Sequence, residues 1–241
     1  VQSIILLGKT RWKNDTLSGT PSFDQLVYAP LRDVQTLALG GRLPQKRDDA
    51  INISFRTESG EETSVAVSRG KNSNLSVTCH GESLGRELES LTEPFCVIAP
   101  GLAGIPSFEE FRSEGIVRRA AARGDANGVF RNVLWILKTT NPSAWDQFQE
   151  RLHQVFPEVA VDITFDVSSD EHLRATVETR DTLMPIDSAG TGVLQAAQVF
   201  AYIGVYHPRL LILDEPDAHL HPNNQRKLVR LLAEVAESDG F

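Results

Sequence analysis

Four consecutive apolar residues, Leu210–Leu213, lead directly into two carboxylates, Asp214 and Glu215, and then into Pro216. A short continuous apolar run is typical of a strand in a parallel sheet, because such sheets are covered on both faces. Ligands of these sheets bind beyond the carboxyl ends of the strands. We therefore expect a buried strand that delivers the acidic pair to a polar site, where one carboxylate suits a hydrated magnesium ion and the other an attacking water. An ordinary acidic turn is the alternative, since Asp-Glu-Pro alone is a weak signal.

A glycine-containing turn, Ser188-Ala189-Gly190-Thr191-Gly192, precedes this strand, and a mostly apolar segment, residues 193–206, lies between them. The predicted order is therefore turn, helix, short loop, strand and acidic pair. A helix N-terminus that glycines let a ligand approach is a natural anion site. The Ser188 hydroxyl adds a donor suited to a phosphate. A plain loop followed by a helix start is the alternative interpretation of Gly190 and Gly192.

Residues 188–232 together resemble the second half of an ABC-type ATPase head, in the branch shared by SMC proteins and the OLD-like (overcoming lysogenisation defect) ATPases of the AAA group. The stretch from Ser188 to Gln195 resembles the signature turn. The stretch Asp-Glu-Pro-Asp-Ala-His-Leu-His-Pro, from Asp214 to Pro222, resembles the Walker B strand end with its D-loop. The resemblance implies an α/β fold, namely a P-loop NTPase-type ABC ATPase head with an antiparallel β subdomain and a helical insertion.

The same resemblance assigns a role to each candidate site residue. It implies that Glu215 is the catalytic base for the attacking water and that Asp214 holds Mg²⁺ through water. The signature residues, implied to contact the ATP held by the opposite subunit, are Ser188, Gly190, Thr191 and Gly192. The D-loop residues, implied to link two active sites, are Ala218, His219, Leu220 and His221. A metal site at the two histidines is disfavoured, because no cysteine or third ligand lies at a suitable spacing.

The function implied by the resemblance is that of a switch that binds and hydrolyses ATP and dimerises around ATP-Mg. ATP and Mg²⁺ would be needed, and the ATP sandwich would make the protein a homodimer or higher oligomer. Such heads serve DNA repair or bacterial anti-phage defence, together with an effector protein such as a nuclease or toxin. Two alternatives stay open: a non-hydrolysing scaffold or sensor module, and a transporter-type ABC ATPase. Transporter heads rarely carry His-Leu-His-Pro after the acidic pair.

The G-x-x-x-x-G-K-[ST] pattern of a phosphate-binding loop does not occur in the 241 residues. Gly8-Lys9-Thr10 has Ser3 where the first glycine of that pattern would stand, and we interpret it as a loop. By resemblance, residues 1–7 correspond to the end of the helix that follows a Walker A loop, and the switch histidine of the family would follow residue 241. We therefore expect a partial head that lacks the Walker A segment and could be inactive as a fragment.

The expected domain organisation is one partial ATPase head over residues 1–241. Alternating apolar residues in 48–80, interrupted by turns such as Ser59-Gly60, predict an antiparallel β meander. Alternation resumes from Val161 to Val177 and predicts a hairpin. Residues 181–241 contain the signature, Walker B and D-loop segments.

Residues 107–157 are predicted to form a helical lobe between these parts. Ser107, followed by Glu109 and Glu110, resembles a helix N-cap with acidic residues in the first turn. Asn141-Pro142-Ser143 predicts the start of a further helix. No sustained heptad pattern is present, so a long coiled coil is not expected.

The one notable basic cluster in this lobe consists of Arg118, Arg119 and Arg123. A charged run on a helix is most often a solvated face, and contact with DNA or with an acidic partner surface is the alternative. The net charge of −8 argues against a nonspecific nucleic-acid coat over the whole surface.

Cys79 and Cys96 lack metal-ligand spacing and favour a reducing cytoplasm. No apolar run approaches the roughly 20 residues of a membrane helix, so no membrane contact is expected.

Overall fold

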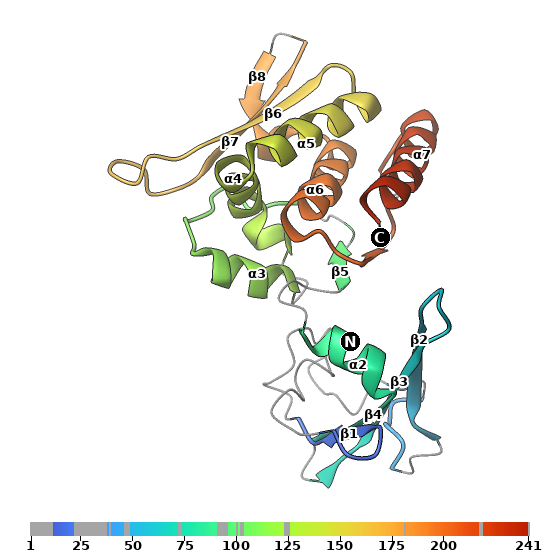
Figure 1. The fold of residues 1–241 in the computed structure, drawn as a ribbon. Helices are drawn as coiled ribbons and strands as arrows, with labels where there is room; N and C mark the ends of the chain where they lie inside the picture. Colours follow the sequence, from blue (N-terminus) through green and yellow to red (C-terminus); the bar gives the residue numbers. More distant parts are fainter. Residues whose placement is uncertain are drawn as a thin grey trace. The chain divides into compact units, whose positions relative to one another are not determined.

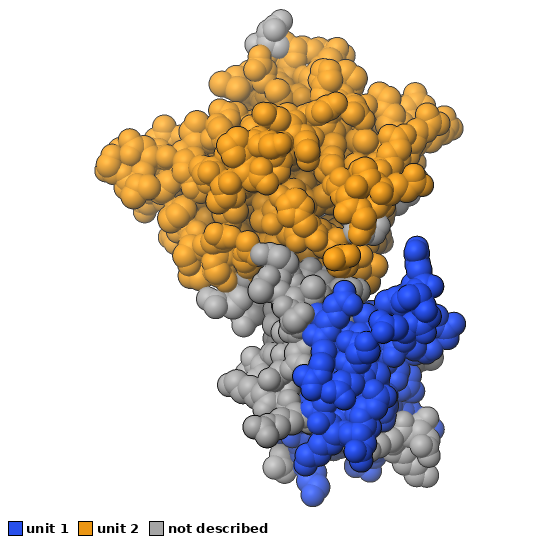
Figure 2. Space-filling model, in the orientation of Figure 1, with its two compact units in different colours: residues 1–95 blue, residues 96–241 orange. Residues whose placement is uncertain are grey.

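The structure is a computed structural model that describes residues 12–21, 38, 40–45, 49–71, 74–90, 96–99, 101, 104–122, 126–180, 182–216 and 219–240. The chain divides into two compact units, residues 1–95 and 96–241, which Figure 2 shows in different colours. Each unit is described by itself, and the expected single head over residues 1–241 stays a prediction. The predicted helix end at residues 1–7 and the loop Gly8-Lys9-Thr10 lie outside the described residues.

The described residues of the first unit form a four-stranded antiparallel sheet and one helix. Its elements are β1 (Thr16–Gly19), β2 (Ile51–Arg56), β3 (Glu62–Arg69), β4 (Leu75–His80) and α2 (Glu82–Ser90). The strand order is β1-β4-β3-β2, so the hairpins of residues 51–80 form the centre and one edge of the sheet. Alternate residues such as Val65, Val77 and Cys79 are buried, because successive side chains of a strand point to opposite faces. The Asp15 carboxylate accepts hydrogen bonds from the backbone N–H groups of Gly81 and Glu82 where α2 begins.

In the second unit, the residues that the structure describes form helices and two small sheets (Figure 1). Its elements are β5 (Cys96–Ala99), α3 (Glu114–Ala122), the 3₁₀ turn η5 (Ala126–Val129), α4 (Phe130–Thr140), α5 (Pro142–Val155), β6 (Val159–Thr164), β7 (Arg174–Thr179), β8 (Thr182–Pro185), the 3₁₀ turn η6 (Ile186–Ser188), α6 (Thr191–Tyr206), β9 (Leu210–Leu213) and α7 (Pro222–Asp239). The strands β6, β7 and β8 form an antiparallel sheet, whereas β5 and β9 pair in parallel.

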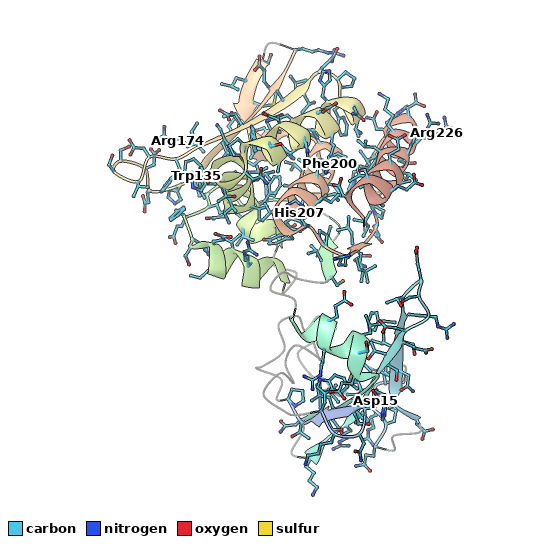
Figure 3. All side chains as sticks on the ribbon, in the orientation of Figure 1. Asp15, Trp135, Arg174, Phe200, His207 and Arg226 are labelled. Carbon is cyan, nitrogen blue, oxygen red and sulfur yellow. The ribbon has the colours of Figure 1, made fainter. Side chains whose placement is uncertain are left out.

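Helix α6 is the centre of the second unit. It packs against α4, α5 and β5, while α4 and α5 also contact β6, and α7 contacts α5 (Figure 1). A helix that is apolar around its whole circumference must be buried, and nearly all of α6 is buried. Phe200, which Figure 3 labels, is fully buried, as are Tyr202 and Tyr206. The helix ends at His207, whose left-handed backbone (φ 41°) directs the chain toward β9.

The strand β9 differs from its prediction, because it is only half-buried. Leu210 and Ile212 are 41% and 43% exposed, whereas Leu211 and Leu213 pack against the core. Among the described residues β9 pairs only with β5, and α6 packs against β5. A sheet covered on one face alternates between buried and exposed positions, even when every residue is apolar.

The start of the helical lobe also differs from its prediction. Ser107 caps no helix, and α3 begins at Glu114. The intervening segment is extended, because Glu110 forms an antiparallel bridge with His172 and the Glu109 carbonyl accepts from the N–H of Leu173. The next helix start is as predicted, since the Asn141 side chain accepts a hydrogen bond from Ala144 N and caps α5. Among the helices that the structure describes, none is long and apolar enough to cross a membrane.

Candidate functional site

The acidic pair lies where two parallel strands end. The register of β5 and β9 pairs Ala99 with Leu213, and one further backbone bond, from Asp214 N to Ala99 O (3.1 Å), continues the pairing. Gly101 follows β5, and a Cβ at this position would lie 3.5 Å from the Asp214 carbonyl oxygen and 3.9 Å from Glu215 Cβ. The carboxyl ends of β5 and β9 therefore meet at one edge, as expected for the ligand-binding edge of a parallel sheet.

Both carboxylates of the pair are available to a ligand. Asp214 and Glu215 are exposed, and neither side chain forms a hydrogen bond or ion pair with a described residue. The Glu215 backbone is left-handed, with φ at 47°. This region costs a non-glycine residue about 1–2 kcal/mol, so contacts elsewhere must hold the turn in place.

The signature residues lie at the start of α6. Gly190 is the residue before the first turn, and its carbonyl accepts from Val193 N and Leu194 N. No described side chain caps this end, so the first N–H groups of the helix have no side-chain acceptor among the described residues. Ser188 and Gly190 are exposed and Thr191 is half-buried, so these three residues border an uncapped helix N-terminus.

Gly192 has a different environment from the other signature residues, because it is buried against the D-loop. A Cβ at Gly192 would lie 2.6 Å from Leu220 Cδ2 and 3.0 Å from the His219 carbonyl oxygen. Gln225 on α7 donates from Nε2 to the Leu220 carbonyl (3.1 Å) and fixes the other side of this segment. The structure therefore brings signature and D-loop residues of the same chain into direct contact.

The remaining D-loop residues are divided between the loop and the next helix. His219 is exposed and has a left-handed backbone (φ 63°). His221 is the N-cap of α7, where its Nδ1 accepts from Asn223 N at 3.3 Å. Ala218 lies outside the described residues. The hydrogen bond to Asn223 N gives His221 a structural role as a helix cap. The sequence-based interpretation did not include this role.

Gln195 ends the stretch that resembles the signature turn, but the sequence-based assignment gave it no role. It lies on α6, one turn after Gly192, and it is 2% exposed. Its Nε2 donates a hydrogen bond of 2.9 Å to the Glu215 carbonyl. The signal was weak, because a glutamine within an apolar helix predicts only a buried polar contact and does not name the partner.

Of the predicted basic cluster, the structure describes the side chain of Arg118. Arg118 forms an ion pair with Glu114 on the same helix, with an N–O distance of 2.7 Å. The side chain of Arg119 and the whole of Arg123 lie outside the described residues. The charge of Arg118 is therefore partly compensated within α3, and contact with DNA or a partner stays a prediction.

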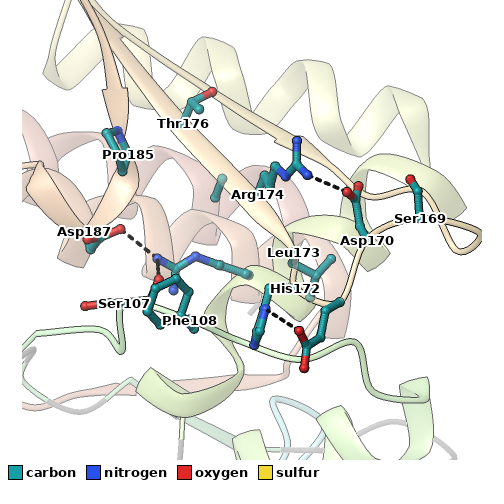
Figure 4. A pocket seen from close by; sticks show the side chains of 13 residues that line it. Ser107, Phe108, Ser169, Asp170, His172, Leu173, Arg174, Thr176, Pro185 and Asp187 are labelled. Atoms are coloured by element: carbon teal, nitrogen blue, oxygen red, sulfur yellow. Dashed lines mark hydrogen bonds and ion pairs between the residues drawn. The ribbon is translucent and has the colours of Figure 1, made fainter.

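A hollow of about 460 Å³ lies between the 107–108 segment, the β6–β7 connection and η6 (Figure 4). None of the predicted site residues lines it. On its wall the buried guanidinium of Arg131 pairs with Asp187 at 2.9 Å and donates to the Pro106 carbonyl. Asp187 precedes Ser188, so Arg131 anchors the segment that leads into the signature turn.

A buried carboxylate, that of Glu109, accepts hydrogen bonds at the start of the helix that carries Arg131. Glu109 is 4% exposed and accepts from the backbone N–H groups of Arg131 and Asn132, the second and third residues of α4, and from the Asn132 side chain. Burial raises the pKa of Glu109, and the N–H donors and the Arg131 charge only partly offset this effect. The carboxylate thus caps α4 from a segment about 20 residues earlier in the chain.

The donor set at the β9 edge fits a magnesium ion bound together with a nucleotide. Within the part of the chain that the structure describes, no three His, Cys, Asp or Glu side chains are grouped to hold a metal. Mg²⁺ typically keeps several waters and is bound by one or two carboxylates plus substrate phosphates. The two exposed carboxylates, Asp214 and Glu215, match that requirement.

Comparison with known proteins finds a family match over the part of the chain that contains the candidate site. Residues 106–240, more than half of the sequence, match the model of a family described as "AAA domain, putative AbiEii toxin, Type IV TA system". No curated protein shows a significant match to the chain. The matched stretch includes the acidic pair, the signature turn, the D-loop and Arg118.

Proposed function

Because the chain belongs to the family of AAA domains described as putative AbiEii toxins of type IV toxin–antitoxin systems, we propose that it is the ATP-hydrolysing head of a molecular switch. An AAA domain implies a P-loop NTPase-type α/β fold and nucleotide binding, and AAA domains are typically ATPases. Our finer proposal is an SMC/OLD-like head of the ABC type that dimerises around ATP-Mg. The observation that carries it is the pair of exposed carboxylates at the joint carboxyl end of β5 and β9.

The two carboxylates have separate roles in this proposal. Asp214 would hold Mg²⁺ through water, and the ion, when bound, supplies positive charge to the phosphate oxygens. Glu215 orients the attacking water and accepts its proton, which is general-base catalysis by a positioned carboxylate. Both carboxylates are exposed, and neither pairs with a described residue. This supports the division, since a carboxylate already paired with an arginine would be a poor base.

The signature residues divide between action in trans and packing in cis. Ser188, Gly190 and Thr191 lie at the uncapped start of α6 and would donate to the terminal phosphate of ATP held by the opposite protomer. Gly192 packs against Leu220 and would keep the D-loop close to α6. A dimer would therefore be needed to complete each active site.

The biological setting that we propose is anti-phage defence or DNA repair, with a nuclease or toxin as the effector. The family description, which names toxin–antitoxin systems, favours defence. A non-hydrolysing scaffold or sensor is the competing function, and the buried anchoring of the signature segment by Arg131 and Asp187 would serve either function.

The proposal is tested by Mg²⁺-dependent ATP hydrolysis of the full-length protein with the substitution Glu215→Gln. We expect turnover to fall by about 10²–10⁴-fold, the usual contribution of a general base, and an ATP-bound dimer to accumulate. Glu237→Gln is the matched control, because Glu237 is an exposed glutamate on α7 outside the site. Normal turnover in Glu215→Gln would refute the assignment of the base. ATP binding without turnover in the wild type would favour the scaffold.

Contact between the basic cluster and DNA is tested separately. Reversing the charge of Arg118, Arg119 and Arg123 to glutamate should weaken DNA or partner binding while ATP turnover without DNA is retained. The control reverses Arg226, Lys227 and Arg230 on α7, which line a different surface groove. Equal loss of binding in both triple variants would show a general charge effect and no specific contact by α3.

A further inference from the structure

A buried glutamine connects the signature helix to the acidic pair. Gln195 lies in the second turn of α6, and its Nε2 donates to the Glu215 carbonyl at 2.9 Å. The two residues are 20 positions apart in the sequence. The bond therefore joins the helix that begins at the signature turn to the turn that carries the candidate base.

The bond from Gln195 reaches the turn at the point where the backbone of Glu215 leaves strand β9. Strand pairing ends with the hydrogen bond from Asp214 N to Ala99 O. The next residue, Glu215, has a left-handed backbone, which is unfavourable for a residue with a Cβ. An acceptor–donor contact immediately after the last paired residue fixes the direction in which the chain leaves the strand.

Stability alone does not explain an amide at position 195. The Gln195 Oε1 is buried and has no hydrogen-bond partner among the described residues. A buried polar atom without a partner costs free energy. A leucine of similar volume would fill this position without that cost. What the amide provides and a leucine does not is the hydrogen bond to the Glu215 carbonyl.

The same helix provides an internal comparison. Gln198 is also fully buried, and its Oε1 likewise has no partner among the described residues. Its Nε2 donates to Asn127 Oδ1 (3.2 Å) and to the Tyr202 hydroxyl (3.3 Å). These two glutamines have similar burial and similar unpaired oxygens, yet only Gln195 contacts the acidic turn.

We infer that Gln195 is a positioning residue that makes α6 and the Glu215 turn move as one unit. The start of α6 would contact ATP held by the partner, so a shift of α6 would change the position of the base in the same protomer. This regulatory role rests on the proposed function. The physical link between α6 and the turn does not, and it can be tested without any ATPase activity.

The link is tested by amide hydrogen exchange of the full-length protein, comparing Gln195→Leu with Gln198→Leu. Loss of one net hydrogen bond should speed exchange in the segment 213–221 by about 2- to 10-fold in Gln195→Leu. Gln198→Leu should leave that segment unchanged, although it removes a buried amide from the same helix. Circular dichroism checks that both variants fold. Equal exchange in the two variants would refute the link.

The regulatory role is tested by the kinetics of the same two variants. In Gln195→Leu we expect kcat to fall by about 10- to 100-fold, since small misplacement of a catalytic group has effects of this size. KM and ATP-induced dimerisation should be retained, and Gln198→Leu should keep all three. An unchanged kcat in Gln195→Leu would overturn the regulatory role. A wild type without turnover would refute the proposed function and leave the exchange result to decide the link.

Discussion

The contact between Gly192 and the D-loop predicts a specific effect of Gly192→Ala. Gly192 is the second residue of α6, where alanine is normally preferred over glycine. The added Cβ would lie 2.6 Å from Leu220 Cδ2 and 3.0 Å from the His219 carbonyl oxygen. Leu220 is 7% exposed, so its side chain has little space to move, and the backbone oxygen can move only with the D-loop.

Two opposing contributions determine the size of the effect. Overpacking of a buried contact costs about 1–3 kcal/mol. The gain in helix propensity and the reduced freedom of the unfolded chain return about 0.5–1 kcal/mol. We therefore expect Gly192→Ala to lower the free energy of unfolding by about 0.5–2 kcal/mol. For a chain of this size that corresponds to a fall in Tm of about 1–8 °C.

The matched control is Gly115→Ala, because Gly115 is the second residue of α3 and a Cβ there would have no atom within 4 Å. We expect this variant to be unchanged or slightly more stable. The assay is thermal unfolding followed by circular dichroism, with amide exchange in the D-loop as a local measure. Equal stability of the two variants, with unchanged exchange at Leu220, would refute the proposed packing of α6 against the D-loop.

Two further predictions concern the polar contacts that support the helical lobe. Burial raises the pKa of Glu109 in the folded state above its ordinary 4.5. Between the pKa of the unfolded state and that of the folded state, the folded protein therefore binds more protons. The free energy of unfolding falls as pH rises through this interval. Urea unfolding at a series of pH values should show this fall in the wild type and its absence in Glu109→Gln; parallel pH profiles would contradict it. Asn141→Ala should cost about 1 kcal/mol in the same assay because α5 loses its cap, whereas Asn141→Ser should retain most of the stability, and equal losses would argue against the cap.

The elements with strong local signals were predictable from the sequence. Alternating apolar residues indicated the hairpin of β6 and β7, and the Asn141-Pro142 pair indicated the start of α5. The start of the helical lobe was placed too early, because Ser107 has the residue type of a helix cap and Glu109 that of an acidic first-turn residue. In the structure Glu109 caps α4 instead, and the pairing of its segment with Leu173 keeps that segment extended. Local rules identify a capping residue type without identifying the helix that it caps.

The candidate site shows the same division. The acidic pair, the signature turn and the D-loop are each contiguous in sequence. The residue types of the pair predict metal chemistry and those of the turn predict anion binding, whereas the role of the D-loop came from the resemblance. Half-burial of β9 was not predictable, because an apolar run does not state how many faces of its sheet are covered. The bond from Gln195 to Glu215 was missed because a buried amide has many potential partners.

By itself, the sequence predicted which short segments carry chemistry: the apolar run that becomes β9, the carboxylates after it, and the glycine turn that opens α6. These features follow from neighbouring residues, whose spacing is sufficient to specify a strand end or a helix start. Only the tertiary structure decided that Gln195 contacts Glu215 and that Gly192 contacts Leu220. Such contacts join residues 20 or more positions apart, so they depend on how α6 packs against β5 and the D-loop, which no local pattern specifies.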